Sequence, residues 1–567
     1  MQTFDILDWI VIGVFCLLLI GVILYVVRQK SNDSADYFLG GKDAGWIAIG
    51  TSIFASNIGS EHLIGLAGAG ASSGMAMAHW EIQGWMILIL GWVFVPFYSR
   101  SMVYTMPEFL ERRYNKESRT ILSVISLISY VLTKVAVTVY AGGLVFQEVF
   151  GIEKLWGIDF FWIAAIGLVL ITALYTIFGG MKSVLYTSIL QTPILLLGSA
   201  IIVVLGLKEV GGWDQMMAIT SSIEVNDYGD SMANLIRSNK DPDFPWLGAL
   251  IGSSIIGFWY WCTDQYIVQR VLSGKNLKES RRGTIFGAYL KLLPVFLFLI
   301  PGMIAFSIHY QSIQSGGEGF LPFLDNGVAN ADAAFPTLVA KLLPAGVKGL
   351  VVCGILAALM SSLASLFNSS AMLFTIDFYK RLKPETPEKK LVKIGQFATL
   401  VIVVLGILWI PIMRSVGDVL YTYLQDVQSV LAPGIASAFL LGITWKRTSA
   451  KGGMWGLISG LVIGLTRLGA KVYYSNLTDA PDSLFKYLFY DLNWLYFCGW
   501  MFLFCILVVI GVSLATKAPE PQKIKGLVFG TTTKEDNEED RKSWNKWDVV
   551  HSAVILALTG AFYWYFW

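Results

Sequence analysis

Long apolar stretches alternate with short polar connections along almost the whole chain. About fourteen of these stretches hold roughly 18 or more mostly apolar residues, the length that crosses a bilayer as a helix. They lie near residues 8–28, 45–68, 76–100, 120–148, 158–178, 183–206, 244–269, 283–308, 346–378, 394–413, 417–442, 453–472, 494–515 and 548–566. The pattern predicts an all-α integral membrane protein with about 14 transmembrane helices.

Two of the apolar stretches are interrupted by polar and ionisable residues. Asn57, Glu61 and His62 interrupt the first, and Asp264 lies in the middle of the second. In hydrocarbon an unpaired polar group is costly, so such interruptions persist where they line a cavity or a site. A matched pair of broken helices in two halves of a chain indicates a secondary transporter, with its binding site at the breaks.

Lys and Arg cluster in alternate connections. The stretch 379–393 holds six of them, whereas 69–75 holds none and 149–157 holds one. The positive-inside rule then places the cation-rich, odd-numbered connections in the cytoplasm. With an even number of spans, both termini should be extracellular or periplasmic. We expect a multi-pass protein of the plasma membrane, with the long connections near 207–243 and 309–345 outside.

The composition supports a lipid-facing surface. The chain is 55% hydrophobic and 14% charged, against about 25% charged in soluble domains. All five cysteines lie inside apolar stretches without metal-ligand spacing, so we expect no cofactor apart from a coupling ion. The bilayer is an expected partner and nucleic acid is not. Residues 517–546 are polar and of mixed charge, which predicts a flexible linker before the last helix.

Several polar side chains inside the apolar stretches are candidates for binding a solute. Glu81 can accept two hydrogen bonds while a neighbouring ring covers an apolar face, which suits a hydroxyl-rich ligand. A structural salt bridge with Lys291 is the alternative, and the two roles are compatible. Gln425 supplies both a donor and an acceptor. Neutral groups with one or two charges favour a polyol-like solute over a strongly charged one.

Ser361 and Ser362 lie in the middle of another apolar stretch. Hydroxyls in such positions usually bond to their own helix. Beside an unwound helix, however, two hydroxyls and the freed carbonyls offer a cage of oxygen atoms for a small cation such as Na⁺.

The motifs at 36–39, 55–60, 105–109, 268–277 and 287–294 occur in an order that resembles the sodium:solute symporter family, in its sodium/glucose cotransporter branch. The resemblance implies a leucine-transporter-like core of five plus five helices in inverted repeat. This core would be 45–442, with repeats at about 45–206 and 244–442. One helix and a cytoplasmic loop would precede it at 1–44. Three C-terminal helices, with a polar cytoplasmic linker at about 517–546, would follow at 443–567.

The resemblance also assigns roles to residues by their position. The sugar-contacting set would be Asn57, His62, Glu81, Tyr260, Trp261, Lys291 and Gln425. The gate would be Tyr260 on the inside, with Leu66, Trp80 and Tyr421 as an outer lid. Sodium would be bound by the backbone carbonyls of Ala55, Ile58 and Ala358 and the hydroxyls of Ser361 and Ser362.

The sequence departs from the family pattern at a few positions. Ser188 stands where sugar-transporting relatives usually have an aspartate associated with a second sodium site, so we expect one Na⁺ per sugar. Gly84 and Gly257 lack side chains that contact the sugar in the galactose-type relative, although His62 resembles the glucose type. The identity of the hexose stays open.

These observations predict sodium-coupled symport of a neutral hexose, glucose or galactose, into the cell by alternating access. A sodium-coupled transporter of myo-inositol or another polyol is an alternative, and so is a sugar-gated ion-conducting sensor that does not accumulate its ligand. An intramembrane enzyme would need more than His62, Glu61 and Glu81, since no metal motif or activated nucleophile accompanies them. We therefore expect no enzyme activity. The oligomeric state stays open.

Overall fold

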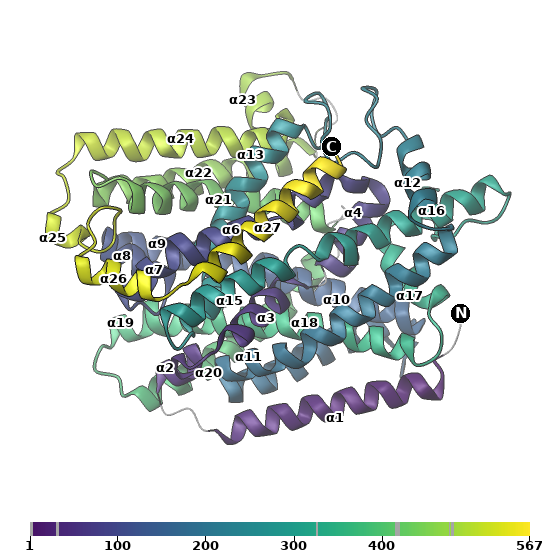
Figure 1. The fold of residues 1–567 in the computed structure, drawn as a ribbon, viewed down its shortest axis with the longest axis horizontal. Helices are drawn as coiled ribbons and strands as arrows, with labels where there is room; N and C mark the ends of the chain where they lie inside the picture. Colours follow the sequence, from purple (N-terminus) through teal and green to yellow (C-terminus); the bar gives the residue numbers. More distant parts are fainter. Residues whose placement is uncertain are drawn as a thin grey trace.

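The computed structural model describes residues 4–29, 33–59, 61–324, 327–413, 420–475, 477 and 481–567. Within these ranges the chain is helical almost throughout, and most long helices run along a common direction (Figure 1). The described strands are β1 (Lys154–Leu155) and β2 (Ile158–Asp159), which pair antiparallel in one connection. The predicted all-α class is confirmed.

The helices follow the apolar stretches of the sequence closely. Up to residue 150 they are α1 (Ile6–Arg28), α2 (Ser34–Leu39), α3 (Trp46–Asn57), α4 (Ala67–Ser72), α5 (Ala78–Glu81), α6 (Gly84–Ile89), α7 (Val95–Ser101), α8 (Met106–Arg113), α9 (Lys116–Ser129) and α10 (Ala136–Phe150). From 160 to 314 they are α11 (Phe160–Val210), α12 (Trp213–Ser222), α13 (Trp246–Gly257), α14 (Gln265–Leu272), α15 (Leu277–Leu290) and α16 (Ile300–Gln314). Beyond these lie α17 (Ala334–Leu342), α18 (Val347–Met372), α19 (Lys380–Leu382), α20 (Glu388–Met413), α21 (Leu420–Thr444), α22 (Ala450–Ser475), α23 (Leu484–Lys486), α24 (Trp494–Ala515), α25 (Pro521–Ile524), α26 (Lys534–Lys542) and α27 (Lys546–Tyr565).

Wider and tighter helical turns join many of these helices. The π-helical turns are η2 (Glu61–Leu66), η4 (Leu90–Phe94), η5 (Tyr130–Val135), η6 (Phe258–Thr263), η7 (Val295–Leu299), η9 (Leu373–Tyr379) and η10 (Tyr487–Asp491). The 3₁₀ turns are η1 (Gly40–Lys42), η3 (Gly74–Met77) and η8 (Ala331–Ala333). Through η5, for example, α9 continues directly into α10, which is the span predicted at 120–148.

Both predicted helix breaks are present. Helix α3 ends at Asn57, Ile58 is extended with ψ 108°, and the helix resumes at Glu61. In the second broken segment, α13 and η6 end at Thr263, and Asp264 is extended with ψ 128° before α14 begins. Each break leaves the carbonyl groups of the preceding turn without a helical N–H partner, which is the situation expected of a binding site in the membrane.

A third irregularity divides the longest helix. Helix α11 has 51 residues and covers two predicted spans, 158–178 and 183–206. Between them Gly180 has φ 52° and ψ −144°, a backbone conformation that residues with a side chain rarely adopt. A Cβ atom at Gly180 would also overlap the carbonyl of Tyr37. The glycine therefore makes the turn between the two spans possible.

Nine helical stretches of the described residues are long and apolar enough to cross a bilayer. The broken segments fall below that length, because α3 and α13 have 12 residues each, and α11 counts as one stretch although it covers two predicted spans. The figure of about 14 spans therefore stays a prediction.

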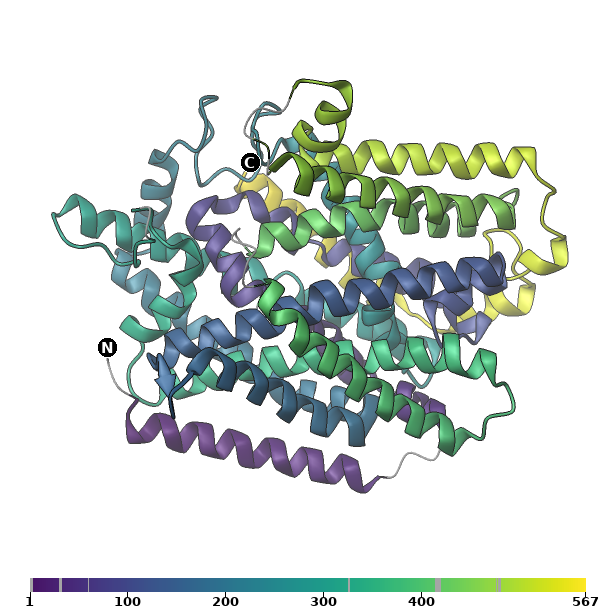
Figure 2. The same cartoon turned by 180° about the vertical axis from the view of Figure 1, so that it is seen from behind.

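The packing separates a buried centre from a lipid-facing rim. The most apolar part of 347–382, which includes α18, is 89% buried, whereas that of α1 is only 17% buried. Helix α18 packs against α11, and α15 packs against α3. Helix α1 lies along the outside of α11 at the edge of the molecule, and α21, α22 and α24 pack together on the opposite side (Figures 1 and 2). The two broken helices are thus held in the centre.

The start of α1 and the end of α27 lie toward the same end of the molecule, where the long connections after α11 and α16 also lie (Figure 1). The backbone N–H of Leu235 in one of these connections donates to the carbonyl of Phe566, with a distance of 3.0 Å. Helices α19, α25 and α26 lie at the opposite end. This arrangement agrees with an even number of crossings, while the side of the membrane that each end faces stays a prediction.

The segment 517–546 differs from the flexible linker that its composition predicts. It forms α25 and α26, and the Thr533 hydroxyl and the Asp536 carboxylate cap α26 reciprocally. The hydrogen bond from the Thr533 backbone N–H lowers the pKa of Asp536. Asp540 forms an ion pair with the buried Arg281 at 2.6 Å. Pairing to α15 therefore orders a segment whose own composition would leave it without structure.

Candidate transport site

A buried cavity of about 50 Å³ lies between the two broken helices. It receives side chains from the two breaks and from α5, α10, α18 and α21. Its polar and aromatic lining comprises Asn57, Glu61, His62, Trp80, Glu81, Gln83, Lys134, Thr138, Tyr260, Trp261, Tyr266, Lys291, Ser362, Gln425 and Gln428. All seven residues of the predicted sugar-contacting set are among them. A space of this size holds only a few water molecules, so the walls must part to admit a larger solute.

Four of the predicted residues form one chain of contacts along a wall of the cavity. Lys291 Nζ donates to Glu81 Oε2 at 2.5 Å, which is the salt bridge considered from the sequence. The other carboxylate oxygen, Glu81 Oε1, lies 3.3 Å from His62 Nε2, and that nitrogen lies 3.2 Å from Asn57 Nδ2. The carboxylate is therefore held from two sides, and its position in the cavity is fixed before any solute arrives.

Aromatic rings form a second wall. Trp261 is buried, its ring meets that of Tyr260 edge-on with centroids 4.9 Å apart, and the Lys291 ammonium lies 5.3 Å from the Trp261 centroid. Gln83 links this wall to its surroundings, because its Oε1 accepts from Trp261 Nε1 at 3.2 Å and its Nε2 donates to the Ser253 carbonyl at 2.8 Å. Gln83 is not among the residues predicted from the sequence.

The absence of a side chain at Gly257 leaves the space that the amide of Gln83 occupies. A Cβ atom on Gly257 would lie 2.5 Å from Gln83 Oε1. The missing side chain at this position, noted from the sequence as a departure from galactose-type relatives, is thus replaced in space by the amide of Gln83.

A buried ion pair lies beneath Tyr260, and sequence reasoning missed its cation. Lys134 Nζ donates to Asp264 Oδ2 at 2.7 Å, and the hydroxyl of Tyr130 donates to Asp264 Oδ1. The ammonium also lies 4.6 Å from the ring centroids of both Tyr260 and Tyr266. The Lys134 ammonium therefore contacts both Asp264, at the second break, and Tyr260, the predicted inner gate. The signal that could have found Lys134 is a single lysine in the predicted span 120–148.

The structure describes the side chains of two of the three residues of the predicted outer lid. Leu66 is fully buried, and Trp80 is buried with its ring stacked on that of Trp494, centroids 5.4 Å apart. Trp494 begins α24, outside the predicted transport core, and was not anticipated as a partner. The side chain of Tyr421 lies outside the described residues. The roles of Leu66, Trp80 and Tyr421 as a lid stay predictions.

The residues of the predicted sodium set lie on α3, at the break directly after it and on α18, and α3 and α18 pack together. Ala55, Ile58, Ala358, Ser361 and Ser362 are all buried. The Tyr266 hydroxyl lies 3.1 Å from Ser362 Oγ and also donates to the Ser56 carbonyl, so it ties the hydroxyl-bearing face of α18 to the last turn of α3. Hydroxyl and carbonyl oxygens are suitable ligands for Na⁺, and coordination by this set stays a prediction.

Ser188 extends this group of hydroxyls. Its Oγ donates to the Val184 carbonyl at 2.6 Å within α11 and lies 3.4 Å from Ser361 Oγ. At the position where related sequences have an aspartate, this chain therefore presents the neutral hydroxyl of Ser188 to the predicted sodium site.

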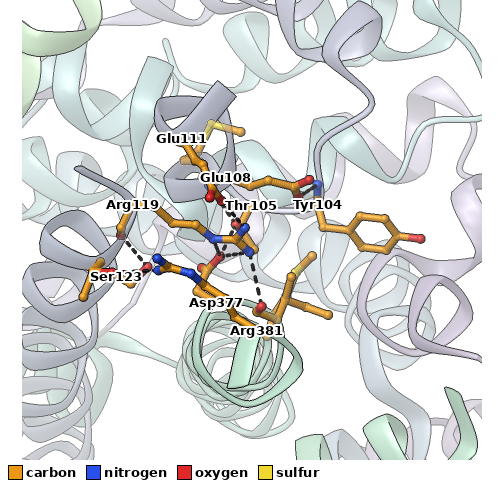
Figure 3. A network of polar contacts seen from close by, with 12 residues as sticks. Tyr104, Thr105, Glu108, Glu111, Arg119, Ser123, Asp377 and Arg381 are labelled. Carbon is orange, nitrogen blue, oxygen red and sulfur yellow. Dashed lines mark hydrogen bonds and ion pairs between the residues drawn. The ribbon is translucent and has the colours of Figure 1, made fainter. Parts of the chain in front are cut away.

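A separate polar network ties α8 and α9 to the end of α18 (Figure 3). Asp377, in η9, is buried and accepts from Arg119 Nε at 2.7 Å and from the Thr105 hydroxyl at 2.8 Å. Arg119 also pairs with Glu111 at 2.6 Å. This network lies at the end of the molecule that the positive-inside rule predicts to be cytoplasmic.

Paired broken helices around a buried cavity of polar and aromatic side chains define a secondary transporter of the membrane. The model of the sodium:solute symporter family matches residues 37–460. The chain belongs to the sodium:solute symporter family and is a sodium-coupled solute symporter.

Relatives agree with this assignment, and a solved structure shares the fold. The chain is 37% identical over 539 residues to the sodium/myo-inositol cotransporter 2 of Homo sapiens, covering 92% of this chain and 79% of that protein. It is 36% identical over 538 residues to the sodium/myo-inositol cotransporter of Canis lupus familiaris, covering 90% of this chain and 74% of the relative. A solved Na⁺-coupled sialic acid symporter is 21% identical with a TM-score of 0.73, covering 91% of this chain and 99% of that one. At that identity the likeness shows the fold, and the predicted leucine-transporter-like class is confirmed.

Proposed function

We propose that this symporter carries a neutral ring polyol into the cell together with Na⁺, and that myo-inositol is its first candidate solute. The observation that carries the proposal is the cavity, in which hydrogen-bonding groups and aromatic faces surround carboxylates that are mostly paired. The choice of myo-inositol over a hexose rests on the relatives, which are named as sodium/myo-inositol cotransporters at 36–38% identity.

The binding roles follow from the contacts. Glu81 is positioned by Lys291 and can accept hydrogen bonds from solute hydroxyl groups through its remaining lone pairs. Gln425 is buried and its Oε1 has no hydrogen-bond partner among the described residues, so a solute hydroxyl can donate to it. Tyr260 and Trp261 cover the C–H face of the ring, as aromatic side chains do for polyols. Asn57 and His62 complete the wall.

Sodium binding would act through the break after α3. One Na⁺, held by the carbonyls of Ala55, Ile58 and Ala358 and the hydroxyls of Ser361 and Ser362, would join α3 to α18 and order the wall that carries Asn57. The ion drives transport only through different affinities in the outward-open and inward-open states. Each charge transferred into an inside-negative cell contributes about 2.3 kcal/mol per 100 mV, which permits roughly fifty-fold accumulation.

The rest of the architecture is proposed with the same function. Residues 45–442 form the inverted-repeat transport core, and the protein spans the plasma membrane with both termini outside. Tyr260 is the inner gate, above the ion pair of Lys134 and Asp264.

Glucose or galactose is the second candidate solute. The residues Asn57, His62, Glu81, Tyr260, Trp261, Lys291 and Gln425, which match the sugar-contacting set by position, all line one cavity. This observation favours a hexose as much as a cyclitol, since both present a ring of hydroxyl groups.

Uptake into proteoliposomes tests the proposal. We expect labelled myo-inositol to accumulate above the outside concentration under an inward Na⁺ gradient, and not when K⁺ replaces Na⁺. Unlabelled myo-inositol should compete at lower concentration than glucose or galactose. The reverse order of competition would transfer the assignment to a hexose. Currents that respond to these solutes without accumulation would instead mean a sensor and would contradict symport.

A further inference from the structure

One carboxylate in the cavity has no cationic partner. Glu61 begins the helix that follows the first break and lines the cavity, with 15% of its side chain exposed. Among the described residues it forms no ion pair with a lysine or arginine, and its Oε2 is buried without a hydrogen-bond partner. Within the part of the chain that the structure describes, its only titratable neighbour at ion-pair distance is His62, whose Nδ1 lies 3.9 Å from Glu61 Oε1.

The other charges around the cavity are paired. Lys291 is committed to Glu81 at 2.5 Å and Lys134 to Asp264 at 2.7 Å. Each of the two lysines in the lining therefore has its own carboxylate partner, and Glu61 is left in the wall without a lysine or arginine partner among the described residues. Gly59 leaves room for it, because a Cβ atom at that position would overlap the Glu61 carboxylate.

We propose that Glu61 is the charge-selecting residue of this site, which admits neutral polyols and excludes those that carry a carboxylate. A neutral solute can donate a hydroxyl hydrogen to the Glu61 carboxylate, which lines the cavity. An anionic solute would be placed beside the Glu61 carboxylate in a water-poor cavity, where both lysines of the described lining already have a carboxylate partner and charges interact far more strongly than in water. The inference deepens the proposed function and rests on its premise that the natural solute is neutral.

The test compares a neutral and an anionic ring as competitors of Na⁺-driven uptake. Uptake of labelled myo-inositol is measured against unlabelled myo-inositol and against D-glucuronate, for the wild type and for Glu61→Gln. The ratio of the two half-inhibitory concentrations should fall at least ten-fold in Glu61→Gln, because glucuronate gains access while the neutral solute keeps a hydrogen-bonding partner. Glu117→Gln, the same change at an exposed position of α9, should leave the ratio unchanged.

The outcomes separate this inference from the proposed function. An unchanged ratio in Glu61→Gln with uptake retained would overturn the charge-selecting role and leave polyol symport standing. A wild type that prefers glucuronate would overturn the proposed function itself. If Glu61→Gln does not transport, the inference is tested by calorimetry instead, which measures the binding of the same two solutes to purified Glu61→Gln and Glu61→Ala. Binding of glucuronate by either variant supports the inference, whereas its continued exclusion, or loss of myo-inositol binding in both variants, overturns it.

Discussion

Replacing Lys134 with methionine removes the cation from the buried pair beneath Tyr260. Methionine keeps the length and the apolar stem of lysine, so the change leaves Asp264 as an uncompensated charge with little change in volume. The side chains of Lys134 and Asp264 are only 8% and 2% exposed, so water cannot take over the role of the lysine. Tyr130 remains as a hydrogen-bond donor to Asp264.

The magnitude follows from the geometry. At 2.7 Å the Coulomb attraction is about 6 kcal/mol for an effective dielectric constant of about 20. Desolvation offsets part of it, and breaking a buried pair from one side typically costs 3–5 kcal/mol. We expect Lys134→Met to lose about 4 kcal/mol of stability. For 567 residues the entropy of unfolding is about 1.2 kcal/mol per degree, so the apparent melting temperature should fall by about 3 °C.

Thermal unfolding of the purified protein in detergent measures this shift. The double variant Lys134→Met with Asp264→Asn should recover most of the loss, because no charge is then left unpaired. Lys390→Met, at an exposed position of α20, is the matched control and should shift the melting temperature by less than about 0.5 °C, since surface substitutions cost little. A single variant as stable as the wild type, or a double variant less stable than the single one, would refute the reasoning.

Three further predictions concern other parts of the molecule. Gly302→Ala should prevent folding to a monodisperse species in size-exclusion chromatography, because its Cβ would overlap a carbonyl of the facing helix, whereas Gly560→Ala, with open space around it, should elute normally. Asp377→Asn should lower the melting temperature by about 2 °C, because it removes the buried one of the two carboxylates that pair with Arg119; an unchanged value would contradict this. Ser361→Ala should raise the Na⁺ concentration for half-maximal uptake by roughly ten-fold, the equivalent of one lost oxygen ligand at about 1.4 kcal/mol. Ser459→Ala in α22 is its control, and equal Na⁺ dependence in the two variants would count against the proposed sodium site.

The sequence predicts the features that the membrane enforces. The helix breaks at Asn57 and Asp264 can be predicted from the sequence, because polar residues inside an apolar span are costly unless they line a cavity or a site. The pairing of Glu81 with Lys291 is anticipated for the same reason, since charged side chains inside spans commonly pair with one another.

Features that depend on packing between distant segments cannot be predicted from the sequence. Gln83 becomes part of the site only because Gly257 leaves space for it, and those residues are far apart in the sequence. Trp80 stacks on Trp494, which lies beyond the predicted core. The segment 517–546 looks disordered by composition, and it is ordered by a partner, Arg281, that its own sequence does not reveal.

The central claim is that solute and Na⁺ enter together. The most direct test is to measure the entry of radioactive sodium and of labelled myo-inositol into the same proteoliposomes, held at a fixed inside-negative potential. We predict that adding the solute increases Na⁺ entry in proportion to solute entry, at one ion per molecule. Solute entry without additional Na⁺ entry would contradict symport, and two ions per molecule would contradict the inference drawn from Ser188.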